Sequence, residues 1–186
     1  MNTTVRGIGI SGKKGSGKTT LADALHKRIL LEGCACQRGS FAGGLKHISR
    51  VALLSLGVEL EDDWKYKYRT LLQAIGQAGR DLYQDLWVDL LLKSREKNAP
   101  FMIVDDVRHT NEAEALRKAG FILIRLDLTN AAWASRGLVP PGQSDLDRHI
   151  SEVALDDYMY WNEQLCVTVG DSPELLADII VQKYLK

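Results

Sequence analysis

Several features that would place this protein in a specialised class are scarce in its sequence. Cysteine occurs only three times, at Cys34, Cys36 and Cys166, an odd number without the paired spacing of a zinc site. We therefore expect reduced thiols rather than a disulfide scaffold, and a metal site at Cys34 and Cys36 is a minor alternative. With four prolines, 45% hydrophobic and 26% charged residues, the composition is that of an ordinary globular protein.

An excess of one charge and a long apolar run are also missing. Lys plus Arg and Asp plus Glu both total 24, so the formal net charge is zero and no block is persistently basic. A nucleic-acid polymer is therefore not an expected partner, and a nucleic-acid-associated ATPase would need a basic track that the sequence lacks. The most apolar windows, 51–56 and 86–92, fall far short of the roughly 20 residues that cross a bilayer. Residues 1–10 lack the apolar stretch of a secretory signal, so we expect a cytoplasmic protein with no membrane partner.

Short apolar runs alternate with longer helical patterns along the chain. This alternation predicts an α/β fold in one domain, 1–186, with a parallel sheet and helices on both faces. The predicted strands are residues 5–11, 36–41, 101–105, 121–126 and 165–169. The predicted helices outside the insertion described next are residues 18–31, 111–119 and 173–184.

Two further segments complete the predicted organisation. Residues 42–98 contain no convincing strand and are predicted to form several helices, inserted between the second and third strands. Such an insertion usually builds a substrate site. Residues 129–147 contain two prolines and two glycines with few apolar residues, which predicts an exposed flexible loop after the fourth strand.

A phosphate-binding loop is the strongest motif in the sequence. Residues 12–19 match the pattern G-x-x-x-x-G-K-[ST], directly after an apolar strand and directly before a helix. Glycines let the backbone wrap a phosphate, and Lys18 would bridge the β- and γ-phosphates of ATP while the hydroxyl of Thr19 is offered to Mg²⁺. A plain glycine-rich turn is the alternative. The predicted nucleotide-binding residues are Gly12, Lys13, Gly15, Ser16, Gly17, Lys18, Thr19 and Thr20.

The third predicted strand ends in two acids, Asp105 and Asp106, a typical place for a carboxylate that serves a magnesium-bound water. Neighbouring residues on a strand point to opposite faces, so the two acids cannot serve the metal equally. An ordinary turn at the end of a strand is the alternative. Arg108 and the pair 111–112 follow at the carboxyl end of this strand, where open parallel sheets place their ligands.

A polar stripe marks the inserted region. Arg69, Gln73, Gly76 and Arg80 recur at spacings of four, three and four, on one face of a predicted helix. This stripe could be a solvated surface, but a glycine inside a helix costs about 1 kcal/mol relative to alanine, and close approach by a ligand would explain it.

Together these segments resemble the bacteriophage-type deoxynucleoside monophosphate kinases, over nearly the whole chain and in the same order. The matching segments are the phosphate loop, 41–46 (Phe-Ala-Gly-Gly-Leu-Lys), 69–76 with Arg80, 105–108 with 111–112, and Asp147-x-His149-x-Ser151-Glu152. The resemblance implies a nucleoside-monophosphate-kinase-like P-loop NTP hydrolase fold, with a helical insertion at 42–98 that binds the acceptor and a short lid at 129–147. Gly43-Gly44 and the small number of arginines in the lid depart from the family pattern.

The resemblance also implies roles for individual residues. Lys18, Thr19 and Asp106 would serve ATP and Mg²⁺, with Asp105 as the second candidate for the metal. The catalytic residues would be Lys18, Asp106, Arg108 and the lid residue Arg136, with Arg125 as a further candidate for contacts to the lid, and His149 would either donate to a phosphate or orient the helix after the lid. The acceptor or the transferred phosphoryl group would be bound by Lys46, Arg69, Gln73, Arg80 and Arg108, with Trp87 shaping the pocket.

The predicted reaction is phosphoryl transfer from ATP to a nucleoside or deoxynucleoside monophosphate, giving the diphosphate. Positioning and charge neutralisation supply the catalysis, so no covalent enzyme intermediate is needed. Two alternatives stay open: a kinase of another phosphorylated metabolite, such as phosphomevalonate, to which Asp106-x-Arg108 is also similar, and a P-loop module that binds ATP without phosphorylating anything. Nucleotides are the expected small-molecule partners, in a host cytoplasm if a phage encodes the protein, and a homodimer is left open.

Overall fold

The computed structural model describes residues 5–95, 99–140 and 153–186. The chain forms two compact units, one made of Met1–Arg38 and Glu96–Lys186, the other of Gly39–Arg95. The first contains the sheet and is called the sheet unit below, and the second is called the helical unit. In the part of the chain that the structure describes, no helix has both the length and the apolar character needed to span a bilayer.

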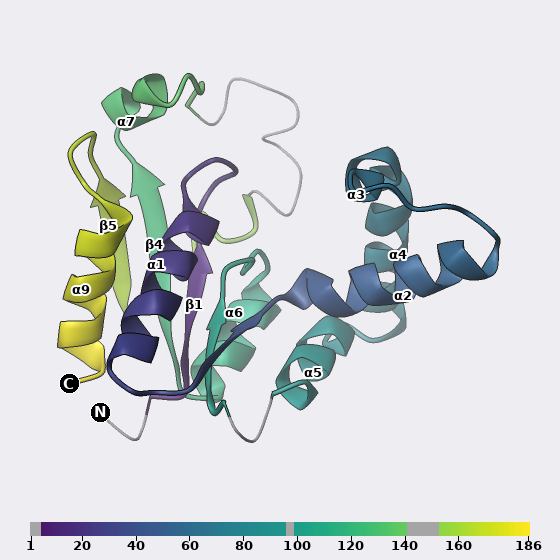
Figure 1. Cartoon of the computed structure of the whole chain (residues 1–186), viewed down its shortest axis with the longest axis horizontal. Coiled ribbons are helices and arrows are strands. Elements are labelled where there is room, and N and C mark those ends of the chain that lie inside the picture. Colours follow the sequence, from purple (N-terminus) through teal and green to yellow (C-terminus); the bar gives the residue numbers. More distant parts are fainter. Residues whose placement is uncertain (1–4, 96–98, 141–152) are drawn as a thin grey trace. The chain divides into compact units, whose positions relative to one another are not determined.

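A five-stranded sheet forms the centre of the sheet unit, in the order β2-β3-β1-β4-β5. β1 pairs in parallel with β3 and with β4, and β4 pairs in parallel with β5 (Figure 1). The predicted α/β fold with a parallel sheet is therefore confirmed. Because β1 is central, the loop that follows it lies between the carboxyl ends of its two neighbours. The strands are β1 (Gly7–Ser11), β2 (Cys36–Gly39), β3 (Phe101–Val104), β4 (Phe121–Leu128) and β5 (Glu163–Val167).

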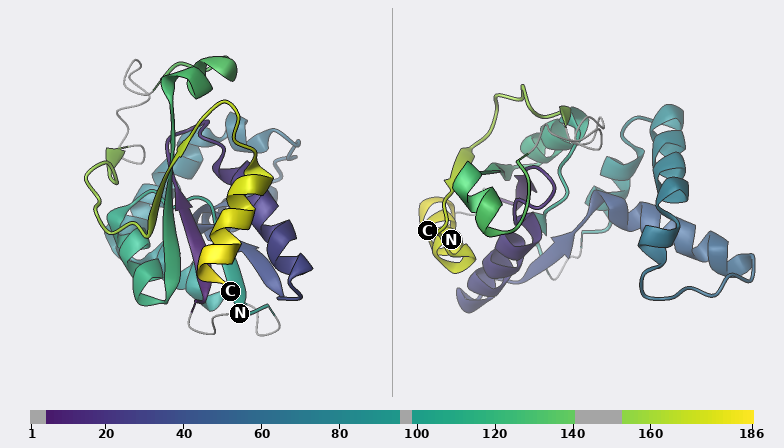
Figure 2. Two further views of the ribbon diagram at one scale, coloured as in Figure 1. Left: turned by 90° about the vertical axis from the view of Figure 1, so that its left-hand side faces the viewer. Right: turned by 90° about the horizontal axis from the view of Figure 1, so that it is seen from above.

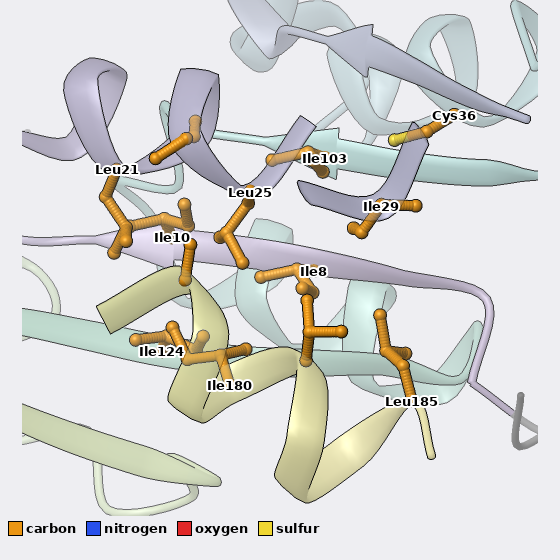
Figure 3. Packing of buried hydrophobic residues seen from close by; sticks show 14 of the residues in the cluster. Ile8, Ile10, Leu21, Leu25, Ile29, Cys36, Ile103, Ile124, Ile180 and Leu185 are labelled. Carbon is orange, nitrogen blue, oxygen red and sulfur yellow. The ribbon is translucent and has the colours of Figure 1, made fainter. Parts of the chain in front are cut away.

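Helices cover both faces of this sheet. α1 (Lys18–Leu31) and α9 (Pro173–Tyr184) lie on one face and α6 (Thr110–Lys118) lies on the other, with the strands between them in the left view of Figure 2. Side chains alternate along β1, so Ile8 and Ile10 enter the core under α1 and α9 (Figure 3). On the opposite face Gly9 leaves room for α6, because a Cβ there would lie 2.8 Å from a methyl carbon of Leu116.

The core below α1 and α9 is almost fully removed from water. Leu21, Leu25 and Ile29, spaced four apart on α1, are each at most 1% exposed and pack with residues of β1, β4 and α9 (Figure 3). Full burial of one such side chain contributes about 1.5–3 kcal/mol. This packing holds α1, and with it the end of the phosphate loop, firmly against the sheet.

The structure differs from the predicted bounds at several elements, and three of these differences have an evident physical reason. The second strand ends at Gly39 rather than at residue 41, because Phe41 begins a helix and buries its ring. The fifth strand spans Glu163–Val167 rather than 165–169, since the carboxylate of Asp171 accepts hydrogen bonds from both the N–H and the hydroxyl of Thr168 and so closes a turn there. The third correction is described next.

The segment predicted as an exposed loop at 129–147 begins with a helix, α7 (Asn130–Ser135). The hydroxyl of Thr129 accepts a hydrogen bond from the N–H of Ala132 at 3.2 Å and caps the helix. Ala132 and Trp133 are buried, at 1% and 5% exposure. Residues 141–147 of the predicted lid lie outside the described residues.

The helical unit consists, in its residues 39–95, of α2 (Phe41–Ser55), α3 (Trp64–Lys67), α4 (Arg69–Leu82) and α5 (Leu86–Lys93). Trp87 of α5 is its central packing residue. The indole of Trp87 is 5% exposed, and its Nε1 donates a hydrogen bond to the carbonyl oxygen of Gly76 at 3.0 Å. A Cβ on Gly79 would lie 2.5 Å from the same indole, so α4 can approach Trp87 only with glycine at that position.

Candidate nucleotide site at the end of β1

The phosphate loop joins the end of β1 to the start of α1, and three of its glycines have positive φ. Gly12, Gly15 and Gly17 have φ values of 146°, 85° and 93°. Other residues adopt this region only with strain. At Gly12 a Cβ would also lie 2.4 Å from the backbone oxygen of Leu126 on β4, so the start of the loop is packed directly against the neighbouring strand.

Two polar side chains point into the loop. The Nζ of Lys18 donates hydrogen bonds to the carbonyl oxygens of Gly12 at 2.6 Å and Lys13 at 2.8 Å, and Lys18 is only 9% exposed. The hydroxyl of Ser16 is buried, with the residue 1% exposed, and finds no hydrogen-bond partner among the described residues. A buried hydroxyl without a partner is costly, and a phosphate oxygen in the loop would accept its hydrogen bond. Thr19 and Thr20 follow on the exposed first turn of α1.

Helix α7 and the residues after it lie against the phosphate loop. The guanidinium Nη1 of Arg136 donates to the carbonyl oxygen of Gly15 at 3.2 Å. Leu138 and Trp133 approach the same glycine so closely that a Cβ on Gly15 would lie 2.7 Å and 3.3 Å from their side chains. The structure thus brings Arg136, predicted from the sequence as a lid residue, next to the loop that follows β1.

The two acids after β3 follow the strand that pairs directly with β1. Val104 is opposite Gly9, and the N–H of Val107 donates to the carbonyl oxygen of Ile10, so Asp105 and Asp106 are held beside the start of the phosphate loop. Asp105 forms an ion pair with Arg38 of β2 at 2.9 Å. Arg38 also pairs with Asp23 of α1, so this guanidinium ties three elements together.

The loop between β3 and α6 is fixed by Glu112. Its carboxylate is 6% exposed and accepts hydrogen bonds from the N–H of Arg108 at 2.7 Å and the N–H of His109 at 3.0 Å. This is the Glu half of a capping box, and the negative charge also suits the positive end of the helix. Glu112 therefore sets the backbone that carries Arg108.

A cavity of about 230 Å³ adjoins the phosphate loop. Its lining residues come from the loop, from the end of β4 and from α7 and the residues after it: Lys13, Leu126, Asp127, Leu128, Asn130, Trp133 and Pro140. Arg125, a candidate for contacts to the lid, lies in β4 next to this region, where its guanidinium binds Asp127, Asp156 and the carbonyl oxygen of Leu155.

Five of the predicted acceptor residues belong to the helical unit. Arg69 and Gln73 are exposed on α4, Lys46 on α2 is half-buried, and the Nη2 of Arg80 donates to Gln77 at 3.3 Å. Trp87 lies in the core of this unit, as described above.

The structure gives a packing reason for the glycine inside α4. A Cβ on Gly76 would lie 3.3 Å from a methyl carbon of Leu45 on α2, and the carbonyl oxygen of Gly76 accepts the hydrogen bond from Trp87. Close packing of α4 against α2 is therefore one reason for a glycine at position 76.

Comparisons with known proteins agree with this arrangement. A family model described as "AAA domain" matches residues 8–136, which include the phosphate loop, the helical unit, β3 and α7. The chain belongs to this AAA domain family. No curated protein matches the sequence.

Solved structures share the fold of this AAA domain at low sequence identity. A shikimate kinase from Acinetobacter baumannii, in complex with shikimate, superposes with a TM-score of 0.51 and 16% identity, over 98% of this chain and 94% of that chain. A structure from Chloroflexus aurantiacus gives a TM-score of 0.51 and 15% identity, over 100% of this chain and 98% of that chain. At these identities the similarity establishes the fold and nothing finer.

Sequence reasoning missed two residues near the loop of this AAA domain. Trp133 could have been found, because Thr129 is a favoured N-cap residue and an aromatic four positions later is typical of a helix with a buried face. Asp156, whose carboxylate binds Lys13, carries no local signal. The predicted motif at 147–152, including His149, lies outside the described residues.

Proposed function

We propose that this AAA domain is an ATP- and magnesium-dependent phosphotransferase whose acceptor is a nucleoside or deoxynucleoside monophosphate. The main support for the proposal comes from two side chains inside the phosphate loop, those of Ser16 and Lys18. There the buried hydroxyl of Ser16 has no partner among the described residues, and the ammonium of Lys18 donates to the carbonyl oxygens of Gly12 and Lys13. A phosphate group in the loop would accept hydrogen bonds from both side chains.

The residues around the loop fit a nucleotide with its metal. The first N–H groups of α1 have no acceptor within the helix, and together with the positive end of the helix dipole they favour a phosphate at Gly17 to Thr20. Lys18 would exchange its carbonyl partners for phosphate oxygens. Bound Mg²⁺ would neutralise phosphate charge, and it usually takes only one or two protein oxygens besides phosphates and waters.

We assign the protein side of the metal site to Thr19 and Asp106. Asp105 is already neutralised by Arg38 at 2.9 Å, which makes it the poorer candidate. Asp106 is the better candidate, because the resemblance to the deoxynucleoside monophosphate kinases assigns the metal to this residue.

The acceptor assignment rests on the resemblance of the sequence to the deoxynucleoside monophosphate kinases. An acceptor phosphate must approach a second polyanion, so the site needs cations that neutralise both. Arg108, two residues after Asp106, and Arg136, which donates to Gly15, are two candidate cations of the sheet unit near the loop. We propose that Lys46, Arg69, Gln73 and Arg80 of the helical unit bind the acceptor, with Trp87 supporting them by packing α4 against α5.

The direct test is a panel of acceptors incubated with Mg-ATP. The panel contains the common ribo- and deoxyribonucleoside monophosphates, phosphomevalonate and, because a structure of similar fold is a shikimate kinase, shikimate. We expect diphosphate formation from at least one monophosphate. Lys18→Ala should reduce it to background, whereas Lys27→Ala, which removes an exposed lysine of the same helix, should leave the rate unchanged.

Each alternative predicts a different result in this experiment. Consumption of phosphomevalonate or shikimate, but of no monophosphate, would replace the acceptor and keep the phosphotransferase. ATP binding without any product would instead indicate a binding module. Absence of ATP binding by the wild-type protein would overturn the proposal altogether.

A further inference from the structure

Asp156 connects the phosphate loop to a distant part of the chain. Its Oδ1 and Oδ2 accept hydrogen bonds from the Nζ of Lys13 at 2.6 Å and 2.7 Å. Its Oδ1 also accepts from Arg125 at 3.0 Å. The two cations hold the pKa of Asp156 below its ordinary value, against the opposing effect of partial burial, so the carboxylate is ionised at neutral pH.

Both the side chain and the backbone carbonyl of Lys13 consequently make hydrogen bonds. Its side chain runs outward to Asp156, and the side chains of the pair are 18% and 40% exposed. Its carbonyl oxygen points inward, where it accepts hydrogen bonds from the Nζ of Lys18 at 2.8 Å and from the N–H of Ser16 at 3.1 Å. A displacement of Lys13 would therefore move the acceptor that positions Lys18.

Asp156 is itself positioned by Arg125 of β4. The guanidinium of Arg125 donates to the carbonyl oxygen of Leu155 at 2.9 Å and packs over the ring of Trp161, at 6.0 Å from its centroid. Arg125 is paired with Ser11, the last residue of β1, across the sheet. The support for Asp156 therefore comes from a strand that lies directly beside the phosphate loop.

We propose that Asp156 is a positioning residue of the nucleotide site, which fixes the phosphate loop through Lys13 before the nucleotide binds. The inference rests on the proposed function, because it takes ATP phosphates as the ligand of the loop. A loop that is already ordered loses less conformational entropy on binding than a free one. Loss of the carboxylate would also leave an extra positive charge near the phosphates, which by itself favours ATP binding. Because Asp156 is half-exposed, salt screens this opposing effect.

The test measures Mg-ATP binding by calorimetry at 0.15 M salt, about the physiological ionic strength, with the full chain. Asp156→Asn should raise the Kd for ATP about fivefold, because ATP binding would then have to order the side chain of Lys13 and the phosphate loop as well. Asp156→Glu, which keeps the charge, should recover most of the affinity. Asp178→Asn is the matched control, because it removes a half-exposed carboxylate from an ion pair with Arg28 and leaves the Lys13 pair intact, and its Kd should stay within twofold of wild type.

A double-mutant cycle shows whether Asp156 acts through Lys13. Lys13→Met should weaken ATP binding by itself, and adding Asp156→Asn to it should change the Kd by less than twofold. In steady state with a saturating acceptor, Asp156→Asn should raise the KM for ATP and leave kcat within twofold, a split that a general loss of stability would not produce below the melting transition.

The outcomes separate the two proposals. If the wild-type protein binds no Mg-ATP, the proposed function fails and this inference fails with it. If the wild-type protein binds Mg-ATP but Asp156→Asn binds it equally well or more tightly, only the positioning role is overturned. Additive effects of the two substitutions would likewise overturn it, and Lys13→Met tests the same pair from its other side should Asp156→Asn fold poorly.

Discussion

Replacing Glu112 by alanine should destabilise the sheet unit by about 2–3 kcal/mol. The substitution removes the acceptor of two backbone hydrogen bonds, from Arg108 at 2.7 Å and from His109 at 3.0 Å. Each bond to a charged acceptor contributes about 1.5–3 kcal/mol. At the low end of this range the two bonds together contribute about 3 kcal/mol. The expected loss is somewhat smaller, because alanine also removes the cost of burying a carboxylate that is only 6% exposed.

Hydrogen exchange measured on peptides that cover residues 105–112 is the most direct assay, because it follows the two N–H groups themselves. In Glu112→Ala these amides should exchange about 30-fold faster or more, the factor that 2 kcal/mol corresponds to at 25 °C. Urea unfolding should show the same change in free energy. Glu112→Gln keeps one oxygen in place and should lose less.

Glu174 provides the matched control. It also lies in the first turn of a helix, α9, but it is exposed, and the N–H of Leu175 there donates its capping hydrogen bond to the hydroxyl of Ser172. Glu174→Ala should change stability by less than about 1 kcal/mol. Unchanged protection of the Arg108 and His109 amides in Glu112→Ala would refute the reasoning, because it would mean that the carboxylate does not hold this loop.

Three further predictions follow from local geometry. Gly12→Ala should abolish Mg-ATP binding in calorimetry and lower the free energy of unfolding by about 3 kcal/mol or more, because a Cβ would lie 2.4 Å from a backbone oxygen. Gly33→Ala is the control: its φ is 76° but the space around it is open, so it should cost only about 1 kcal/mol. Burial raises the pKa of Cys36 to about 12, so a thiol reagent at pH 8 should label exposed Cys166 first and Cys36 only in urea. Burial and a hydrogen bond to the carboxylate of Glu114 raise the pKa of Tyr158 from 10 to about 12, so the folded state holds the phenol proton more tightly than the unfolded state does. The protonated phenol therefore contributes its full stabilisation below pH 10, and this contribution falls as the pH rises towards 12. Tyr158→Phe should lack this pH dependence when melting temperatures are measured across the range.

The elements that the sequence predicted most closely are those with strong local signals. The helix at 18–31 begins where the phosphate-loop motif ends, and the helix at 173–184 has Ser172 as N-cap and Pro173 at its first position; both were predicted with the bounds found. These signals depend on neighbouring residues only. The parallel pairing of the strands also followed from the alternation of strand and helix, because a parallel sheet needs crossover connections.

The boundaries that the sequence did not predict depend on side chains far away in the chain. Phe41 was predicted as the last residue of the second strand, but its burial in the helical unit favours a helix that begins at this residue. Trp133 was taken as part of a loop because Pro140 and Gly137 follow it, yet its burial against the phosphate loop stabilises a short helix. In each case tertiary packing decided between two local conformations of similar propensity.

In the candidate site, too, some residues have a local sequence signal and others are brought in only by packing. The phosphate loop could be recognised because its chemistry requires glycines, a lysine and a hydroxyl at fixed spacing in one segment. The Lys13–Asp156 pair joins residues 143 positions apart, and no spacing rule connects them. A residue that binds phosphate is therefore visible in the sequence, whereas a residue that positions the first one becomes visible only when the strands are placed side by side. Asp156 reaches Lys13 because Arg125 of β4 binds both its carboxylate and the carbonyl oxygen of Leu155, and no local pattern in the sequence predicts this contact.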